Sequence, residues 1–144
     1  WCEEPGSIIH VGMEESLALL AYGMGWKLDT ITESIEPVIS KKMVQTPYLT
    51  VQPDEAAGVH QISTGIRNGR TVITLELYMY VGAEDSVDAT YIDATPSIDM
   101  KIHGGIFGDS ATIGMVANTL YSMASAPAGL LTVIDLPTIR LQDG

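Results

Sequence analysis

The chain has 144 residues, of which 46% are hydrophobic, and its mean hydropathy is +0.20. It carries 7 basic and 18 acidic residues, which gives a formal net charge of -11. This charge argues against a nucleic-acid partner and against an anionic membrane surface, because both need clustered Lys and Arg. A chain of this length is expected to form one domain. Its apolar content fits either a well-filled core or apolar surface buried against a partner subunit or another domain.

The sequence also indicates the compartment. No apolar run approaches the roughly 20 residues that span a bilayer, and no basic segment followed by an apolar one marks a signal peptide. The single cysteine, Cys2, excludes an internal disulfide and fits a reducing compartment, so we expect a cytoplasmic protein. Because the chain starts at Trp1 and not at Met, we expect it to be part of something longer.

A helix is predicted from Met13 to Met24. Glu14 and Glu15 lie in its first turn, where acidic side chains favour the positive end of the helix dipole. Its apolar residues recur at helical spacing, and the stripe that they form consists of Leu17, Leu20, Ala21 and Met24. Trp26 is expected to pack just past the end of this helix.

Residues 30–40 alternate and are rich in β-branched side chains, which predicts a strand. Its expected common face carries Ile31, Ile35 and Ile39. Pro37 has no ladder donor, so this strand belongs at a sheet edge or contains an irregularity. Residues 41–55 are predicted to form a linker with a short strand around Tyr48 to Val51.

The strongest local signal is a hairpin over Ala57 to Val81, with Asn68-Gly69 as its turn. A type I′ turn at these two residues places Arg67 opposite Arg70. One face is then apolar enough to take a helix, and it carries His60, Ile62, Thr64, Ile66, Thr71, Ile73, Leu75 and Leu77. The other face is mixed and available to water, another subunit or a ligand, and it carries Val59, Gln61, Ser63, Gly65, Val72, Thr74, Glu76, Tyr78 and Tyr80.

The last third of the chain predicts two strands and a second helix. The strands are Asp88 to Thr95 and Ile98 to His103, and a glycine-rich turn follows them. Asp109 or Ser110 is expected to cap the helix, whose predicted buried stripe consists of Ile113, Val116, Ala117, Leu120 and Met123. An apolar segment over residues 130–134 and a tail with one more possible strand complete the chain. These elements predict an α+β fold, a largely antiparallel (mixed) sheet with two main helices packed on one face.

No complete catalytic constellation is visible in the sequence. The turn Gly104–Gly108 lacks the Lys-Ser/Thr of a P-loop and does not match a dinucleotide fingerprint. A tight turn is favoured there, and an anion held by helix amides is the alternative. The three histidines, His10, His60 and His103, are not spaced as zinc ligands, so no metal site is predicted.

Four side chains are candidates for ligand contacts. His10 lies just before a helix, where an imidazole can be aimed into a cleft and can donate or accept a hydrogen bond. His60 lies on the predicted apolar hairpin face, where a satisfied buried imidazole is favoured over a ligand. Tyr78 and Tyr80 lie with Glu76 on the mixed face. Such a row can orient an amine, although a subunit contact is the favoured interpretation.

A family resemblance is carried by five segments that occur in one order, His10–Ser16, Ile35–Val38, Gly58–Gln61, Gly104–Thr112 and Ala126–Leu130. Together they resemble the C-terminal domain of the dihydrodipicolinate-reductase-like oxidoreductases. Within these the chain is most similar to the 2,4-diaminopentanoate dehydrogenase and native amine dehydrogenase group. The resemblance covers nearly the whole chain, and it departs from the pattern at Ala128, where a second Pro is usual.

The resemblance implies an enzyme of two domains, in which a Rossmann domain binds NADP or NAD and residues 1–144 form a single substrate-binding and dimerisation domain. The implied reaction is the reversible reductive amination of a small carbonyl compound by ammonia, in a homodimer formed through the sheet. The catalytic carboxylate would belong to the missing domain, so this chain is expected to be inactive alone. The position that matches His10 lines the substrate pocket in the family, and His60, Tyr78 and Tyr80 are the other expected substrate-binding residues, from their places on the hairpin.

Two alternatives stay open. One is a free-standing binding or assembly module whose only functional surface is the mixed sheet face. The other is a sibling reductase that acts on a cyclic imine such as dihydrodipicolinate. Such reductases hold dicarboxylates with basic residues, and only seven Lys and Arg occur in this chain, so the amine dehydrogenase is favoured.

Overall fold

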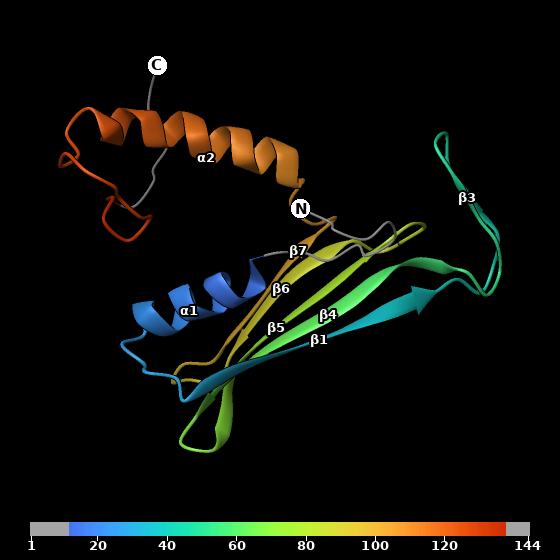
Figure 1. Cartoon of the computed structure of the whole chain (residues 1–144), viewed down its shortest axis with the longest axis horizontal. Helices are drawn as coiled ribbons and strands as arrows, with labels where there is room; N and C mark the ends of the chain where they lie inside the picture. Colours follow the sequence, from blue (N-terminus) through green and yellow to red (C-terminus); the bar gives the residue numbers. More distant parts are fainter. Residues whose placement is uncertain (1–11, 138–144) are drawn as a thin grey trace. The chain divides into compact units, whose positions relative to one another are not determined.

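The computed structural model of the chain describes residues 12–137 and divides into two units, Trp1–Glu84 and Asp85–Gly144. The first unit contains α1 (Met13–Gly23), β1 (Thr30–Ile39), β2 (Val44–Gln45), β3 (Thr50–Val51), β4 (Ala56–Arg67) and β5 (Arg70–Tyr80) (Figure 1). The second contains β6 (Val87–Ile92), β7 (Ile98–His103) and α2 (Gly108–Met123). Helices combined with antiparallel sheets confirm the predicted α+β class.

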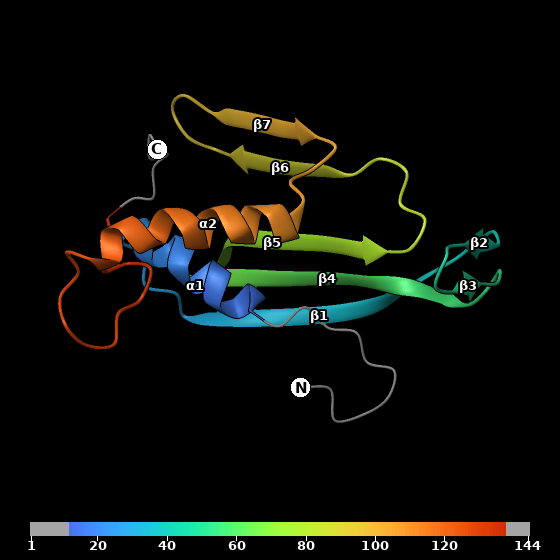
Figure 2. The same ribbon diagram turned by 90° about the horizontal axis from the view of Figure 1, so that it is seen from above.

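The first unit is built on a three-stranded antiparallel sheet with the order β1-β4-β5 (Figure 2). β1 lies at one edge, as Pro37 predicts, and pairs with β4 along its whole length. Pro37 is opposite Val59, and the register shifts between Val38 and Ile39, beyond the proline. The missing backbone donor is therefore placed where a sheet tolerates it.

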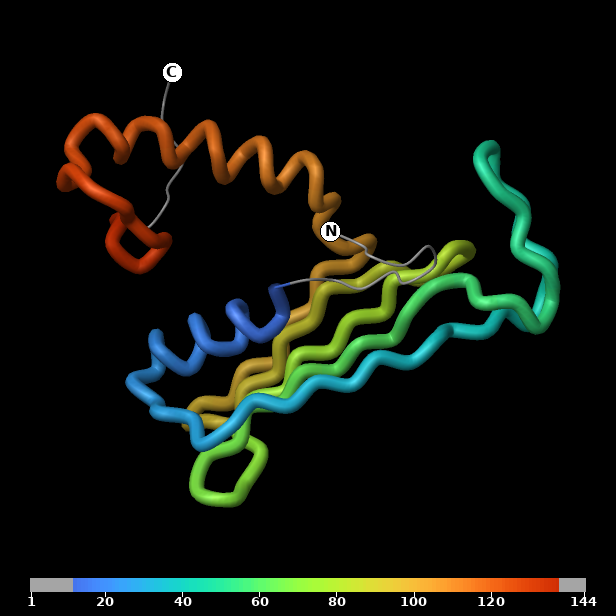
Figure 3. The backbone as a smooth tube through the Cα atoms, viewed as in Figure 1, coloured from blue at the N-terminus to red at the C-terminus, as the bar shows by residue number. Residues whose placement is uncertain are grey.

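The hairpin between β4 and β5 forms as predicted. Arg67 pairs with Arg70, and the turn residues Asn68 and Gly69 have φ values of 53° and 71°. Positive φ at both central residues is what a type I′ turn requires. Figure 3 shows the tight loop in which the chain reverses between the two strands.

A register shift in this hairpin overturns the predicted assignment of faces. Thr64 pairs with Thr74, but Ile66 pairs with Thr71, so a β-bulge lies between Gly65 and Ile66. Such a bulge gives one strand an extra residue and exchanges the faces beyond it. The face that α1 covers, here called the α1 face, therefore carries Ile31, Glu33, Ile35, Pro37, Val59, Gln61, Ser63, Gly65, Ile73, Leu75, Leu77 and Met79.

The opposite face of the sheet is here called the His60 face. It carries Thr32, Ser34, Glu36, Val38, Gly58, His60, Ile62, Thr64, Ile66, Thr74, Glu76, Tyr78 and Tyr80. The sequence predicted that the β4 residues of this face would lie under a helix, and this prediction was wrong. Only the β5 part of the predicted helix-bearing face, Ile73 and Leu75, packs against the core that contains α1.

The core of the first unit lies between α1 and the sheet. Leu17 and Ala21 form a buried cluster with Ile73, against which Trp26, Leu28, Ile31, Val72 and Leu75 pack. The buried residues of α1 are Met13, Leu17 and Ala21, spaced four apart, so the helix contacts the sheet through one narrow row. The predicted packing of Trp26 is confirmed. Leu20 and Met24 of the predicted stripe are instead 47% and 45% exposed.

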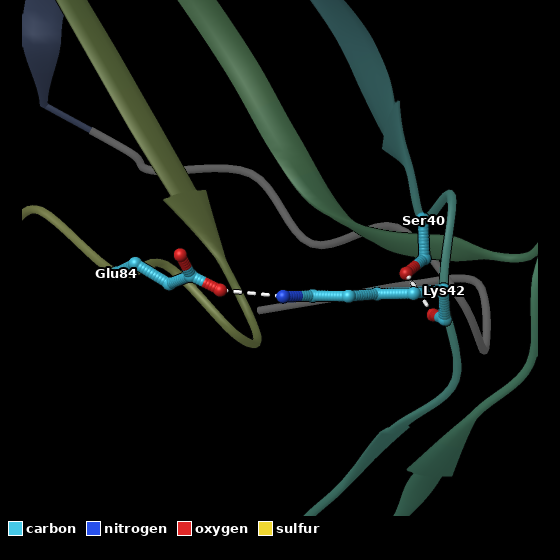
Figure 4. Close-up of polar contacts among 3 residues, drawn as sticks. All are labelled: Ser40, Lys42 and Glu84. Carbon is cyan, nitrogen blue, oxygen red and sulfur yellow. Dashed lines mark hydrogen bonds and ion pairs between the residues drawn. The ribbon is translucent and has the colours of Figure 1, made fainter.

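A two-stranded arm, β2 and β3, extends beyond the end of β1 and β4 (Figures 1 and 2). At its base the Ser40 hydroxyl donates to the Lys42 carbonyl at 2.6 Å (Figure 4). The Lys42 ammonium donates to Glu84 at 2.5 Å, and this hydrogen bond raises the pKa of Lys42 and lowers that of Glu84. The predicted short strand near Tyr48 is thus half of a hairpin whose other strand the sequence did not reveal.

The second unit has a β6-β7 hairpin followed by α2. The predicted strands are confirmed, but the predicted details of the helix are wrong. Phe107 occupies the N-cap without a side-chain hydrogen bond, and Asp109 lies inside the first turn. No residue of α2 is buried, so the predicted apolar stripe faces no core within this unit. No strand occurs over residues 130–137, and the rest of the tail lies outside the described residues.

Substitution of two glycines in β4 tests the packing of the sheet. A Cβ at Gly58 would collide with the backbone of β5 at Met79, and one at Gly65 would lie 2.8 Å from Leu17. We expect Gly58→Ala to lower the free energy of unfolding by about 3 kcal/mol, and Gly65→Ala by about 1–3 kcal/mol, because a clash with a side chain relaxes more easily than one with backbone. Urea denaturation measures both values.

Gly23 in α1 provides the matched control, because a Cβ there meets nothing within 4 Å. Gly23→Ala should leave the free energy of unfolding unchanged or raise it by up to about 1 kcal/mol. Equal effects of all three substitutions would contradict the close packing at β4.

Candidate functional site

Three polar side chains meet on the His60 face. His60 Nε2 donates a hydrogen bond to Glu76 Oε1 at 2.7 Å. The His60 ring also stacks on Tyr78, with the ring centroids 3.9 Å apart and the planes 6° from parallel. The side chain of His60 is 20% exposed and that of Glu76 is 49% exposed. An imidazole, a carboxylate and a phenol thus form one partly exposed cluster.

This cluster corrects the predicted place of His60. The sequence placed it on the apolar face, away from Glu76 and Tyr78, as a buried histidine. The bulge at Gly65 brings His60 directly opposite Tyr78 and diagonal to Glu76. Gly65 itself was the signal that sequence reasoning missed, because a glycine within a strand often marks a bulge.

Tyr80 lies on the same face, opposite Gly58, and next to Tyr78 along the face. Glu36 on β1 pairs with His60 from the other side. Three of the four predicted ligand-contact residues are therefore brought together, namely His60, Tyr78 and Tyr80. The fourth, His10, lies outside the residues that the structure describes.

The surroundings of Tyr78 raise the pKa of its phenol. The pKa of Tyr78 is raised above the ordinary value of 10.0, and the largest cause is desolvation. The hydrogen bond to Glu76, the charge of Glu76 and the charge of Tyr80 contribute in decreasing order. The phenol therefore stays neutral at physiological pH and donates a hydrogen bond to Glu76. With the Glu76 carboxylate beside it, the cluster can accept a hydrogen bond from an amine or pair with polar groups of another subunit.

A second cluster of polar side chains lies on the α1 face, and the sequence did not predict that it would be buried. Gln61 and Ser63 are fully buried there, and Gln61 Nε2 donates to Glu33 Oε1 at 2.9 Å. Ser63 Oγ has no hydrogen-bond partner within the described part of the chain. Buried polar side chains are usually paired, because an unpaired hydroxyl loses its hydration without compensation. These residues give the α1 face a polar strip beside its apolar core.

The glycine-rich turn of the second unit does not fit a dinucleotide. Gly104 and Gly105 have positive φ, which confirms a tight turn. Asp88 Oδ2 accepts a hydrogen bond from the Ile106 amide at 2.7 Å, just before α2. A carboxylate in this position occupies an amide and opposes the charge of a phosphate.

The described residues also contain no group of three or more His, Cys, Asp or Glu that fits a metal ion. Within the same range, none of the helices is long and apolar enough to cross a membrane.

Comparisons with known proteins agree with the predicted resemblance. Residues 3–143 match the family described as the 2,4-diaminopentanoate dehydrogenase C-terminal domain. The chain is 31% identical over 136 residues to a 2,4-diaminopentanoate dehydrogenase of Acetoanaerobium sticklandii, a match that covers 91% of this chain and 38% of that relative. The chain thus spans about two fifths of the length of the relative.

A solved structure, that of an amine dehydrogenase from Mycobacterium smegmatis, has the same fold with a TM-score of 0.74. It is 20% identical in sequence, and the match covers 90% of this chain and 39% of that structure. At this level of identity the likeness concerns the fold and not the chemistry of a site.

Replacement of Glu76 by Gln tests the polar cluster. We expect the pKa of Tyr78 to fall toward the ordinary value of about 10, because the negative charge of Glu76 is lost while the larger effect, desolvation, remains. In the native protein the phenol of Tyr78 ionises at a higher pH in the folded state than in the unfolded state. The raised pKa therefore adds to the free energy of unfolding fully below about pH 10, and this contribution is lost as the pH rises through the raised pKa.

The measurement is a spectroscopic titration of the phenolate, with Tyr78→Phe subtracted to isolate one residue among the tyrosines. Asp99→Asn on β7 removes a carboxylate from the second unit and serves as the control, which should leave the titration of Tyr78 unchanged. An unaltered titration in Glu76→Gln would contradict the assigned contact.

Proposed function

Because the chain belongs to the 2,4-diaminopentanoate dehydrogenase C-terminal domain family, we propose that it is the substrate-binding and dimerisation domain of an NAD(P)H-dependent amine dehydrogenase. The observation that carries this proposal is the family match, which extends over residues 3–143 and so over nearly the whole chain. The shared fold with an amine dehydrogenase supports it independently.

The proposed reaction is the reversible oxidative deamination of a small amine. The amine, NAD(P)⁺ and water give the carbonyl compound, ammonia, NAD(P)H and a proton. The name of the relative makes 2,4-diaminopentanoate the first substrate to test. The glycine-rich turn at Gly104 and Gly105 does not fit the dinucleotide, so we assign dinucleotide binding and the catalytic carboxylate to polypeptide outside this domain, and we expect the 144 residues alone to be inactive.

The His60 face is the proposed contact between two copies of the chain. Its Tyr78 and Tyr80 are 57% and 38% exposed, and Ile62 and Val38 lie half-buried beside them. Tyrosines around a partly apolar centre are typical of subunit interfaces, and most homo-oligomers pair the same face across a twofold axis. The competing role of His60, Tyr78 and Tyr80 is direct contact with the substrate amine, while His10 is proposed as a residue of the substrate pocket.

The activity is tested on the complete polypeptide that contains residues 1–144. We expect NAD(P)⁺ reduction with 2,4-diaminopentanoate, and NAD(P)H oxidation with small ketones or aldehydes in the presence of ammonia. The 144 residues alone should show neither reaction. Dihydrodipicolinate is the comparison substrate, because its reduction without ammonia would identify the sibling reductase. Turnover of none of these compounds would favour a non-catalytic binding module.

The interface is tested by Tyr78→Ala, with Tyr48→Ala as the matched control because Tyr48 lies at the exposed turn of the arm. We expect Tyr78→Ala to raise the dissociation constant of the dimer by about tenfold or more, as loss of an interface aromatic usually does. Sedimentation velocity measures this constant. A raised KM with an unchanged dissociation constant would instead assign Tyr78 to the substrate.

A further inference from the structure

His60 lies among acidic groups on its face of the sheet. Glu36 on β1 pairs with it from one side, and Glu76 on β5 accepts the hydrogen bond from its Nε2 at 2.7 Å. Tyr78 stacks against its ring. The neighbours of His60 on β4 that share this face are uncharged, and the face as described carries no Lys or Arg. The imidazole therefore contacts one carboxylate, that of Glu76, and one neutral phenol, and Glu36 is its partner in the backbone pairing of β1 with β4.

Pairing of two copies through this face, as proposed above, repeats each of these groups across a twofold axis. Each copy then brings Glu36, Glu76 and His60 into the interface. While the imidazoles are neutral, the carboxylates repel one another, and the repulsion grows as water is excluded. A protonated His60 compensates one of the two carboxylates in each copy, and its charged hydrogen bond to Glu76 is stronger than the neutral one.

We propose that His60 makes self-association pH-dependent, so that the dimer takes up protons as it forms and is tighter in mildly acidic solution. This inference rests on the proposed dimer and goes beyond it, because the pairing of two sheets by itself requires no pH dependence. An imidazole ordinarily changes charge between about pH 5 and pH 8, whereas carboxyl groups titrate below this range and phenols above it.

The test measures the dissociation constant of the complete polypeptide by sedimentation velocity at about pH 8 and about pH 6, at constant ionic strength. For the native protein we expect a constant that is about tenfold lower at the acidic pH, the size expected from one partly exposed ion pair in each copy. His60→Gln retains an amide donor for Glu76 but cannot titrate, so its dissociation constant should be the same at both pH values.

His103→Gln is the matched control, because it removes an exposed histidine of β7 in the second unit and should keep the native pH dependence. A native dissociation constant that does not change with pH overturns the inference, and so does a pH dependence that survives in His60→Gln. These results leave the proposed dimer intact. A protein that stays monomeric at both pH values contradicts the dimer itself, and the inference with it.

Discussion

The fold of the first unit depends on the close approach of α1 to β4 at Gly65. An added Cβ there would lie 2.8 Å from Leu17 and 3.0 Å from Leu28, so helix and strand meet with no room for a side chain. The register shift lies directly beside this glycine. The bulge and the helix contact thus occur at one point, and together they determine which residues of the long hairpin face α1 and which face away.

The register shift at Gly65 determines which polar side chains lie on each face of the sheet. Gln61 and Ser63 turn toward α1 and become buried, whereas His60 turns away and reaches Glu76 and Tyr78. A hairpin without the bulge would separate the imidazole from the carboxylate and the phenol. The polar cluster is therefore a consequence of backbone geometry at a glycine several residues away, and not of a local motif.

The second unit lacks a core of its own within the described residues. None of its residues up to 137 is buried, although α2 and the β6-β7 hairpin carry many large apolar side chains. Exposed apolar surface of this extent normally marks a site of contact with other polypeptide. This agrees with a chain that spans about two fifths of the length of its relative, and it supports the proposal of a domain that works within a larger enzyme.

The sequence by itself determined most of the elements and the family. Asn68-Gly69 specified the turn and Pro37 specified an edge strand, because both follow from local backbone preferences. The charge of -11 argues against a nucleic-acid partner, because such partners need clustered Lys and Arg. The segments that resemble the amine dehydrogenases were also recognisable without coordinates.

Only the tertiary structure decided which residues of the hairpin lie on which face of the sheet. Alternation predicts that residues two apart share a face, but a single extra residue in one strand reverses the assignment beyond it. The register shift lies beside Gly65, which packs against Leu17, a contact between segments far apart in the chain. The neighbours of His60 therefore came from the register of β4 and β5 and not from the sequence around the histidine.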